Sequence, residues 1–225
     1  MTGSTNCYEN IRQRMDVAAI AAARAAHDVR LLAVSKRQSI SAIKRIAALG
    51  QREFGENYLQ EAQTKIVDLA GLNLTWHYIG QVQSNKTRLI ASLFDWVHSV
   101  DRLKIAERLN VQRPELSPPL NICVEVNISG EARKGGIAVD EVPEFVDSLA
   151  AFNRLRVRGL MALPAPNVDI ESQRAVFRLM HETLSKLNRP AVTDLSMGTS
   201  DDFEAAIAEG ATLVRIGTAL FGKRV

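Results

Sequence analysis

The sequence contains very little cysteine. Cys7 and Cys123 lie far apart, with no CxxC pair and no histidine at a zinc-ligand spacing. Two isolated cysteines exclude a disulfide framework, and the four histidines are scattered without a metal-ligating pattern. We therefore expect no metal site, and we expect the reducing cytoplasm as the compartment.

Long apolar runs and blocks of like charge are also missing. No run of about 18 apolar residues occurs, and the opening residues MTGSTNCYENIRQRMD are polar, unlike the apolar core of a signal peptide. The 28 basic and 25 acidic residues are mixed along the chain and leave a net charge of +3. This pattern excludes the basic block typical of nucleic-acid binding and suits an anionic small ligand. We expect neither a membrane nor a nucleic acid as partner.

What the sequence does contain is a regular alternation of two kinds of segment. In segment 39–50, Ile40, Ile43, Ile46 and Ala47 share one helical face, and Gly50 follows where a C-terminal cap belongs. Short apolar or β-branched runs predict strands at 31–35, 52–56, 76–80, 96–100, 121–127, 155–163, 193–198 and 212–218. Between them, helical periodicity covers 39–50, 57–70, 84–94, 101–110, 139–152, 170–187 and 201–210.

This alternation predicts a parallel sheet covered by helices. Eight strand–helix units in 225 residues favour a (β/α)8 TIM barrel over a doubly wound sheet, which more often stops at about five or six strands. The Ala-rich run AAIAAARAAHD predicts an additional helix, from about Tyr8 to His27, that flanks or plugs the barrel. We expect one domain over 1–225, with the N-terminal helix within 1–30 and the barrel over 31–225.

Lys36 stands at the end of the first predicted strand, in LLAVSK. Because side chains alternate along a strand, Lys36 shares a face with Val34 and Leu32. The active sites of such barrels lie at the carboxyl ends of the strands. An ammonium desolvated there has a lowered pKa and is available as a nucleophile, which is the type of lysine that forms a Schiff base. The alternative is a lysine that extends into solvent.

The last two strands lead into turns rich in glycine and hydroxyl groups. The segment DLSMGTSDDFEAAI passes through Ser196, Gly198, Thr199 and Ser200 into a helix, and RIGT places Gly217 and Thr218 after the eighth strand. Loops after strands seven and eight commonly hold phosphate in barrels, and backbone amides of such turns can face an anion. Asp201 and Asp202 are expected in the first helical turn, so a phosphate would lie on the loop amides. The alternative is ordinary helix capping.

Arg215 lies inside the eighth predicted strand, in LVRIG, and shares a face with Leu213 and Gly217. A guanidinium in a barrel strand needs an acceptor. An unprotonated pyridine nitrogen is one candidate, because arginine stays charged and keeps such a nitrogen deprotonated. The alternative is a core ion pair with Glu125 or Glu53.

A lysine for an aldehyde, a phosphate-binding turn and an arginine for a ring nitrogen together describe pyridoxal 5′-phosphate (PLP). From about residue 30 onwards, the chain resembles the pyridoxal phosphate homeostasis protein family, relatives of the amino-terminal barrel of alanine racemase. The motifs that carry the resemblance are LLAVSK, FGENYLQEAQTK, WHYIGQVQSNK, VHSVDR, VNISGEARKGGI, RGLMALPAP and LSMGTSDDFEAAIAEGATLVRIGTALFG.

The resemblance implies roles for individual residues. Lys36 corresponds to the lysine that carries the cofactor as a Schiff base, and Arg215 to the arginine that faces the pyridine nitrogen. The residues that correspond to phosphate binding are Ser196, Gly198, Gly217 and Thr218.

Four further residues have weaker support as cofactor contacts. Asn57 can reach the phenolic oxygen of the cofactor or cap the following helix. His77 can lie against the pyridine ring or be an ordinary core histidine. Lys86 and Lys134 can act as secondary amines for the aldehyde and form a second PLP site, or they can be ordinary surface lysines.

The resemblance implies a cytoplasmic PLP-binding protein that buffers the cofactor or delivers it transiently to apo-enzymes, as a monomer and without catalytic residues. The alternatives are an amino-acid racemase of limited scope and a Schiff-base aldolase. Racemisation needs a base on each face of the α-carbon, and in the racemase relatives the second base is a tyrosine from another domain. None of Tyr8, Tyr58 and Tyr78 is an evident substitute, so we expect no racemase activity.

Overall fold

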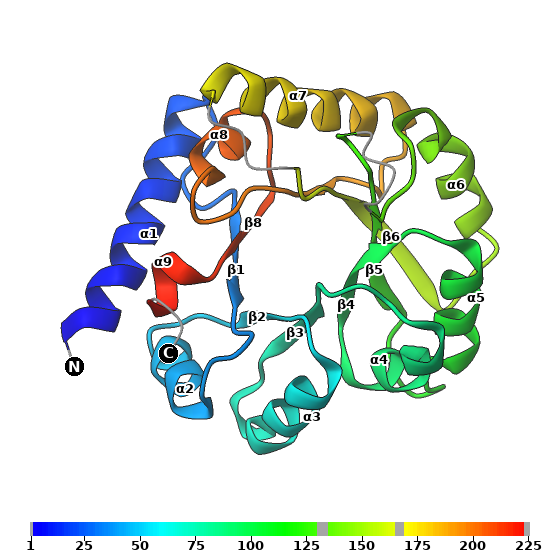
Figure 1. Cartoon of the computed structure of the whole chain (residues 1–225), viewed down its shortest axis with the longest axis horizontal. Helices are drawn as coiled ribbons and strands as arrows, with labels where there is room; N and C mark the ends of the chain where they lie inside the picture. The colour runs from blue at the N-terminus through cyan, green and yellow to red at the C-terminus, as the bar shows by residue number, and fades with distance from the viewer. Residues whose placement is uncertain (1, 130–134, 165–168, 223–225) are drawn as a thin grey trace.

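The computed structural model describes residues 2–129, 135–164 and 169–222. Within them, eight parallel strands pair in sequence order and β8 pairs back onto β1, so the sheet closes into a barrel. Helices surround the ring of strands (Figure 1). The predicted (β/α)8 barrel is confirmed. The strands are β1 Arg30–Val34, β2 Glu53–Glu56, β3 Thr75–Tyr78, β4 Trp96–Val100, β5 Leu120–Glu125, β6 Leu155–Met161, β7 Asp194–Ser196 and β8 Leu213–Ile216.

The helices follow the strands in the predicted alternation. Helix α2 shows why the local sequence folds this way: the Ser39 side chain accepts the Ala42 N–H at its start, and Gly50 follows its end with a positive φ of 102°. The helices are α1 Thr2–Ala21, α2 Ile40–Ala48, α3 Leu59–Asp68, α4 Thr87–Leu93, α5 Leu103–Gln112, α6 Val142–Leu149, α7 Ile170–Leu187, α8 Phe203–Ala208 and α9 Thr218–Phe221, with 3-10 turns η1 Ala70–Leu72, η2 Ser84–Lys86 and η3 Val139–Glu141.

The main hydrophobic core lies between the strands and the helices, and we call this layer the outer shell. Alternate side chains of each strand point outward into it, such as Phe54 of β2, where they meet Ile43 of α2, Phe177 of α7 and Phe203 of α8. All four of these side chains are fully buried. The remaining strand residues point into the barrel, and those near the carboxyl ends of the strands line the site.

Helix α1 flanks the barrel beside α8 and α9 instead of plugging it (Figure 1). The predicted extent, to about His27, is wrong, because the helix ends at Ala21. Tertiary contacts terminate it: the Arg24 guanidinium donates to the carbonyl oxygens of Ile207 and Ala211 at 3.3 and 2.7 Å. Such contacts outweigh the helix propensity of an alanine run.

The start of α8 also differs from the prediction. The helix begins at Phe203, so Asp201 and Asp202 precede it instead of forming its first turn. The Asp202 carboxylate accepts the N–H and the hydroxyl of Thr199, at 2.5 and 2.9 Å. This short turn leaves the loop after β7 folded over the end of the barrel.

Candidate functional site

A cavity of ≈ 240 Å³ opens inside the barrel at the carboxyl ends of the strands. It contains five of the residues predicted from sequence, namely Lys36, Asn57, Arg215, Gly217 and Thr218. The other lining residues are apolar Val34, Ile79, Met161 and Leu163, and polar His98, Glu125, Thr199, Ser200 and Asp201.

Lys36 follows β1 and lies on the same side of the strand as Val34, since both line the cavity. The chain around it is fixed by a buried cluster on the outer side of the strands. Lys65 Nζ donates to the Ser35 carbonyl, to Glu56 Oε1 and to Glu61 Oε1, at 2.7, 2.7 and 2.6 Å. The backbone N–H of Arg37, the residue after Lys36, donates to the same Glu61 oxygen at 2.5 Å. The backbone on both sides of Lys36 is therefore anchored to α3.

Arg215 of β8 is buried and presents its guanidinium to the cavity. Its Nη1 donates to the carbonyl and hydroxyl oxygens of Ser196, at 2.6 and 2.8 Å, and its Nη2 donates to the Ala162 carbonyl at 2.8 Å. In the described part of the chain, neither Glu125 nor Glu53 forms an ion pair with it, and Glu53 pairs with Arg30 instead. Burial lowers the pKa of Arg215 to about 10, so the side chain remains a charged donor at neutral pH.

The loops after β7 and β8 form one wall of the cavity. Ser200 and Thr218 bring hydroxyl groups there, and Ser200 Oγ accepts the Ala219 N–H at 3.4 Å, which joins the two loops. Gly198 has a φ of +90°, and a Cβ on it would lie 2.6 Å from Ala206 Cβ, so this glycine is needed for packing against α8.

Two residues predicted for phosphate binding thus lie outside the cavity wall. Neither Ser196 nor Gly198 belongs to the described lining residues. Ser196 lies below the wall, where its hydroxyl contacts Arg215 and His98. Their contact with a phosphate stays a prediction, whereas their support of Arg215 and of the loop is visible in the structure.

Asn57, directly after β2, has a buried side-chain oxygen without a hydrogen-bond partner. The alternative role as a helix cap is wrong, because Tyr58 is the N-cap residue of α3 and no side chain caps that end. A buried amide with an unsatisfied oxygen is costly. At the edge of a cavity it indicates a position where a ligand supplies the missing partner.

The two histidines of the barrel interior occupy different places. His77 of β3 is fully buried and stacks on Trp96, with ring centroids 5.3 Å apart and planes 8° apart. It lies outside the described cavity wall, whereas His98 of β4 belongs to it. Sequence reasoning missed His98. The signal available was a single histidine within WVHSV, a strand in which every residue is buried.

Glu125 at the end of β5 was considered only as an ion-pair partner, yet it lines the cavity. Burial, together with the nearby Asp101, raises the pKa of its carboxyl to about 7. Of the proposed secondary amines, Lys86 ends η2 away from the cavity wall. Lys134 lies outside the described residues.

The residues that line the cavity fit the cofactor implied by the sequence. They combine an amine on a fixed backbone, a buried guanidinium that only donates, hydroxyl groups from two adjoining loops, and a buried amide oxygen without a partner. These groups match the aldehyde, the ring nitrogen, the phosphate and a polar ring substituent of PLP. Over residues 2–129, 135–164 and 169–222, no group of His, Cys, Asp and Glu is arranged to hold a metal ion.

Comparison with known proteins decides the family. The family model described as "Alanine racemase, N-terminal domain" matches residues 9–225. The pyridoxal phosphate homeostasis protein of Pseudomonas aeruginosa is 55% identical over 219 residues, which cover 96% of this chain and 95% of that protein. The chain belongs to the pyridoxal phosphate homeostasis protein family. The protein of that name from Escherichia coli is 48% identical over 95% of this chain and 94% of its own. The resemblance drawn from the motifs is thus confirmed.

Solved structures agree with this family. PipY of Synechococcus elongatus, solved with PLP bound, has a TM-score of 0.81 and 36% identity over 94% of this chain and 100% of its own. The alanine racemase of Corynebacterium glutamicum, with 18% identity and a TM-score of 0.67, covers 96% of this chain with 61% of its own length. That likeness shows a shared barrel fold. Among the helices described here, none has the length and apolar character needed to cross a membrane.

Proposed function

We propose that this protein binds PLP in the cavity at the top of the barrel and holds it for intracellular PLP homeostasis, by buffering or by delivery. The observation that carries the proposal is that Lys36 and Arg215, 179 positions apart, line one cavity together with hydroxyl groups of two loops. The relatives named for PLP homeostasis and the PLP-bound PipY structure support it. A single barrel domain is sufficient for this role.

Each residue has a definite task in the proposal. When bound, PLP would supply an electrophilic aldehyde, and the Lys36 amine would hold the cofactor there by condensing with it, with loss of water. Arg215 donates to the ring nitrogen and, having no proton to give up near neutral pH, keeps that nitrogen unprotonated. Ser200, Gly217 and Thr218 bind the phosphate, and the Asn57 amide contacts the ring oxygen.

We propose that the protein does not turn over amino acids. None of Tyr8, Tyr58 and Tyr78 belongs to the described cavity wall, so a tyrosine base opposite Lys36 is not available. In the proposal the protein acts in the cytoplasm as a monomer and gives the cofactor to apo-enzymes in transient contacts. Chiral chromatography of alanine and serine incubated with cofactor-loaded protein should show no turnover. Turnover that disappears in Lys36→Ala would instead establish a racemase.

Cofactor attachment is tested by reduction and mapping. Borohydride treatment of the PLP-loaded protein should fix one pyridoxyl group, and mass spectrometry of the peptides should locate it on Lys36. Lys86→Ala serves as the matched control, because Lys86 lies away from the cavity wall, and it should label as the wild type does. Quantitative label on any other lysine would contradict the proposal.

A further inference from the structure

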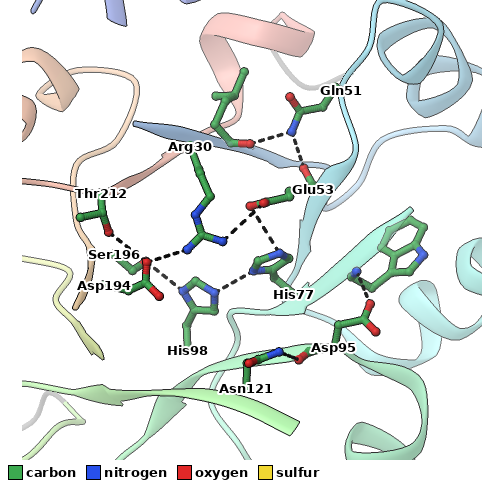
Figure 2. A network of polar contacts seen from close by, with 12 residues as sticks. Arg30, Gln51, Glu53, His77, Asp95, His98, Asn121, Asp194, Ser196 and Thr212 are labelled. Carbon is green, nitrogen blue, oxygen red and sulfur yellow. Dashed lines mark hydrogen bonds and ion pairs between the residues drawn. The ribbon is translucent and has the colours of Figure 1, made fainter. Parts of the chain in front are cut away.

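A continuous chain of polar contacts runs down the inside of the barrel from the cavity towards the amino-terminal face. Arg215 Nη1 donates to Ser196 Oγ at 2.8 Å, and Ser196 Oγ lies 2.9 Å from His98 Nδ1. His98 Nε2 lies 2.9 Å from His77 Nδ1, and His77 Nε2 lies 3.6 Å from Glu53 Oε2. Figure 2 shows the two imidazoles in line between Ser196 and Glu53. The chain thus joins five strands through side chains alone.

Arg215 sets the arrangement of hydrogen atoms along the hydrogen bonds that lead from it to His77. A guanidinium only donates, so Ser196 Oγ is the acceptor in that contact. The single hydroxyl proton of Ser196 is then directed at His98 Nδ1, the other partner described for this oxygen. His98 must carry its proton on Nε2 and donate it to His77 Nδ1. His77 in turn carries its proton on Nε2, which faces Glu53 Oε2 at 3.6 Å, too far for a hydrogen bond.

The opposite arrangement leaves polar groups unsatisfied. If His98 donated from Nδ1 to Ser196, the hydroxyl proton of Ser196 would have no acceptor among its described partners. His77 would then donate from Nδ1 and turn the bare lone pair of its Nε2 towards the Glu53 carboxylate, an arrangement of two acceptors. Unsatisfied buried groups cost about 1–3 kcal/mol each. The direction of the hydrogen bonds from Arg215 to His77 follows from this difference.

The charges around the two imidazoles keep both rings neutral. Burial is the main cause that holds their pKa values well below the ordinary range; His98 and Arg30 add to it for His77, and Arg215 and Arg30 add to it for His98. Arg30 of β1 donates to Glu53 of β2 and to Asp194 of β7, at 3.4 and 2.8 Å (Figure 2). Asp194 is also 3.5 Å from Arg158 Nε of β6, and Cys123 of β5 lies close enough to these charges to be affected by them. A neutral ring has one donor and one acceptor nitrogen, as the chain requires.

We propose that His98 and His77 are positioning residues that hold the Ser196 hydroxyl as an acceptor for Arg215, with Arg215 setting the tautomers from the cavity end. They keep the guanidinium aimed at the cavity, and so they set how well the site receives an acceptor ring nitrogen. The effect on PLP rests on the proposed function. The tautomers do not, because they are properties of the protein alone.

The tautomers are tested without cofactor by long-range 1H–15N NMR of protein labelled at its four histidines. His77 and His98 should both show a protonated Nε2 and a bare Nδ1, unchanged from pH 6 to 8. Spectra of His77→Asn and His98→Asn assign the signals. A proton on Nδ1 of His98, or a charged ring in this pH range, would overturn the proposal whether or not PLP binds.

The positioning role is tested with a pair of variants at His98. His98→Asn retains an acceptor at the place of Nδ1, whereas His98→Leu removes it. We expect His98→Leu to weaken PLP binding about 3- to 10-fold, and His98→Asn to restore most of that loss. Cys123→Ala, a truncation in the same interior layer, should bind as the wild type does. Circular dichroism establishes that each variant folds.

The outcomes separate the two proposals. Equal affinity of His98→Leu, His98→Asn and wild type would refute the positioning role. Failure of the wild type to bind PLP would refute the proposed function and leave the tautomer result to stand alone. If His98→Leu does not fold, Ser196→Ala removes the same acceptor from Arg215 and should show the same loss.

Discussion

The outer shell and the barrel interior are lined by opposite kinds of side chain. In the shell, apolar residues such as Ile43, Phe54 and Phe177 are fully buried against one another. Inside the barrel, apolar residues such as Trp96, Cys123 and Met161 lie beside charged and hydrogen-bonded groups. Apolar burial stabilises a fold at about 25 cal/mol per Å², whereas buried charges at best offset their own desolvation.

This difference means that the outer shell mainly determines stability and the barrel interior mainly determines ligand binding. Apolar burial in the outer shell stabilises the closed ring of strands. Part of that free energy offsets the cost of keeping the polar groups of the interior dehydrated and oriented. Burial raises the pKa of Glu53, although Arg30 opposes the shift. The chain of polar contacts inside the barrel is therefore costly to bury. Its benefit is that it presents the guanidinium of Arg215 at the cavity as a hydrogen-bond donor.

The sharpest test of this separation is Lys36→Ala. It should abolish borohydride-fixed PLP completely, because the attacking amine is gone, while the free energy of unfolding stays within about 0.5 kcal/mol of wild type, as for substitutions away from packing. Mass spectrometry and urea unfolding measure the two quantities. Loss of stability as large as the loss of binding would break the comparison.

The converse test is Phe177→Ala in the shell. Removing a fully buried phenyl ring of α7 should lower the free energy of unfolding by about 3–5 kcal/mol, through lost burial and the cavity left behind. Urea unfolding followed by circular dichroism measures this. The folded fraction should bind PLP with wild-type affinity, and a selective loss of affinity would show that the shell shapes the site directly.

The cluster of Lys65, Glu56 and Ser35 is the exception that sharpens the comparison, because it places a buried ion pair on the shell side, behind Lys36. Lys65→Met should lower the free energy of unfolding by about 3 kcal/mol, since Glu56 is left buried without its cation. In the double variant Lys65→Met/Glu56→Met, most of this loss should be recovered. A double-mutant cycle in urea measures the coupling, and additive effects would contradict the role of the pair.

The smallest effect is expected at Glu125, inside the cavity. Its folded-state pKa of about 7 lies above the ordinary value of 4.5 for this group, so the folded chain binds this proton more tightly than the unfolded chain. Stability from this group is therefore present below about pH 4.5 and lost as the pH rises to about 7. Glu125→Gln should match the wild type at pH 4.5 and exceed it by about 1–2 kcal/mol at pH 8, after allowance for solvent screening. Urea unfolding at both pH values measures this.

Local patterns predicted much of the fold and part of the site. The period-two pattern located the strands and the helical pattern located the helices. The alternation of side chains along a strand put Lys36 and Val34 on one side of β1. Both signals are contained in a few neighbouring residues. The end of α1 was missed because Arg24 acts on carbonyl groups more than 180 positions away. No local pattern reports such a contact.

The sequence also did not predict which of the candidate polar side chains line the cavity. Ser196 ends β7 and Thr199 follows it in the loop, yet only Thr199 belongs to the cavity wall described here. Which of two neighbouring hydroxyl groups reaches the cavity depends on where the strand ends and on the φ of Gly198. His98 was missed because a histidine in a buried strand has the same pattern as a core residue, and its partners come from β3 and β7.

The pairing of β1 with β8 closes the barrel, and it also determines when the site can form during protein synthesis. Leu32 of β1 is paired with Arg215 of β8, so the strand that leads to Lys36 is bonded to the strand that carries the arginine. A ribosome delivers β1 early and β8 late, at about 5–20 residues per second. During that interval the nascent chain contains Lys36 without Arg215, the loop after β7 or the ring that surrounds them. The cavity therefore forms only after β8 pairs with β1. A ligand bound by residues from both strands then stabilises the closed barrel.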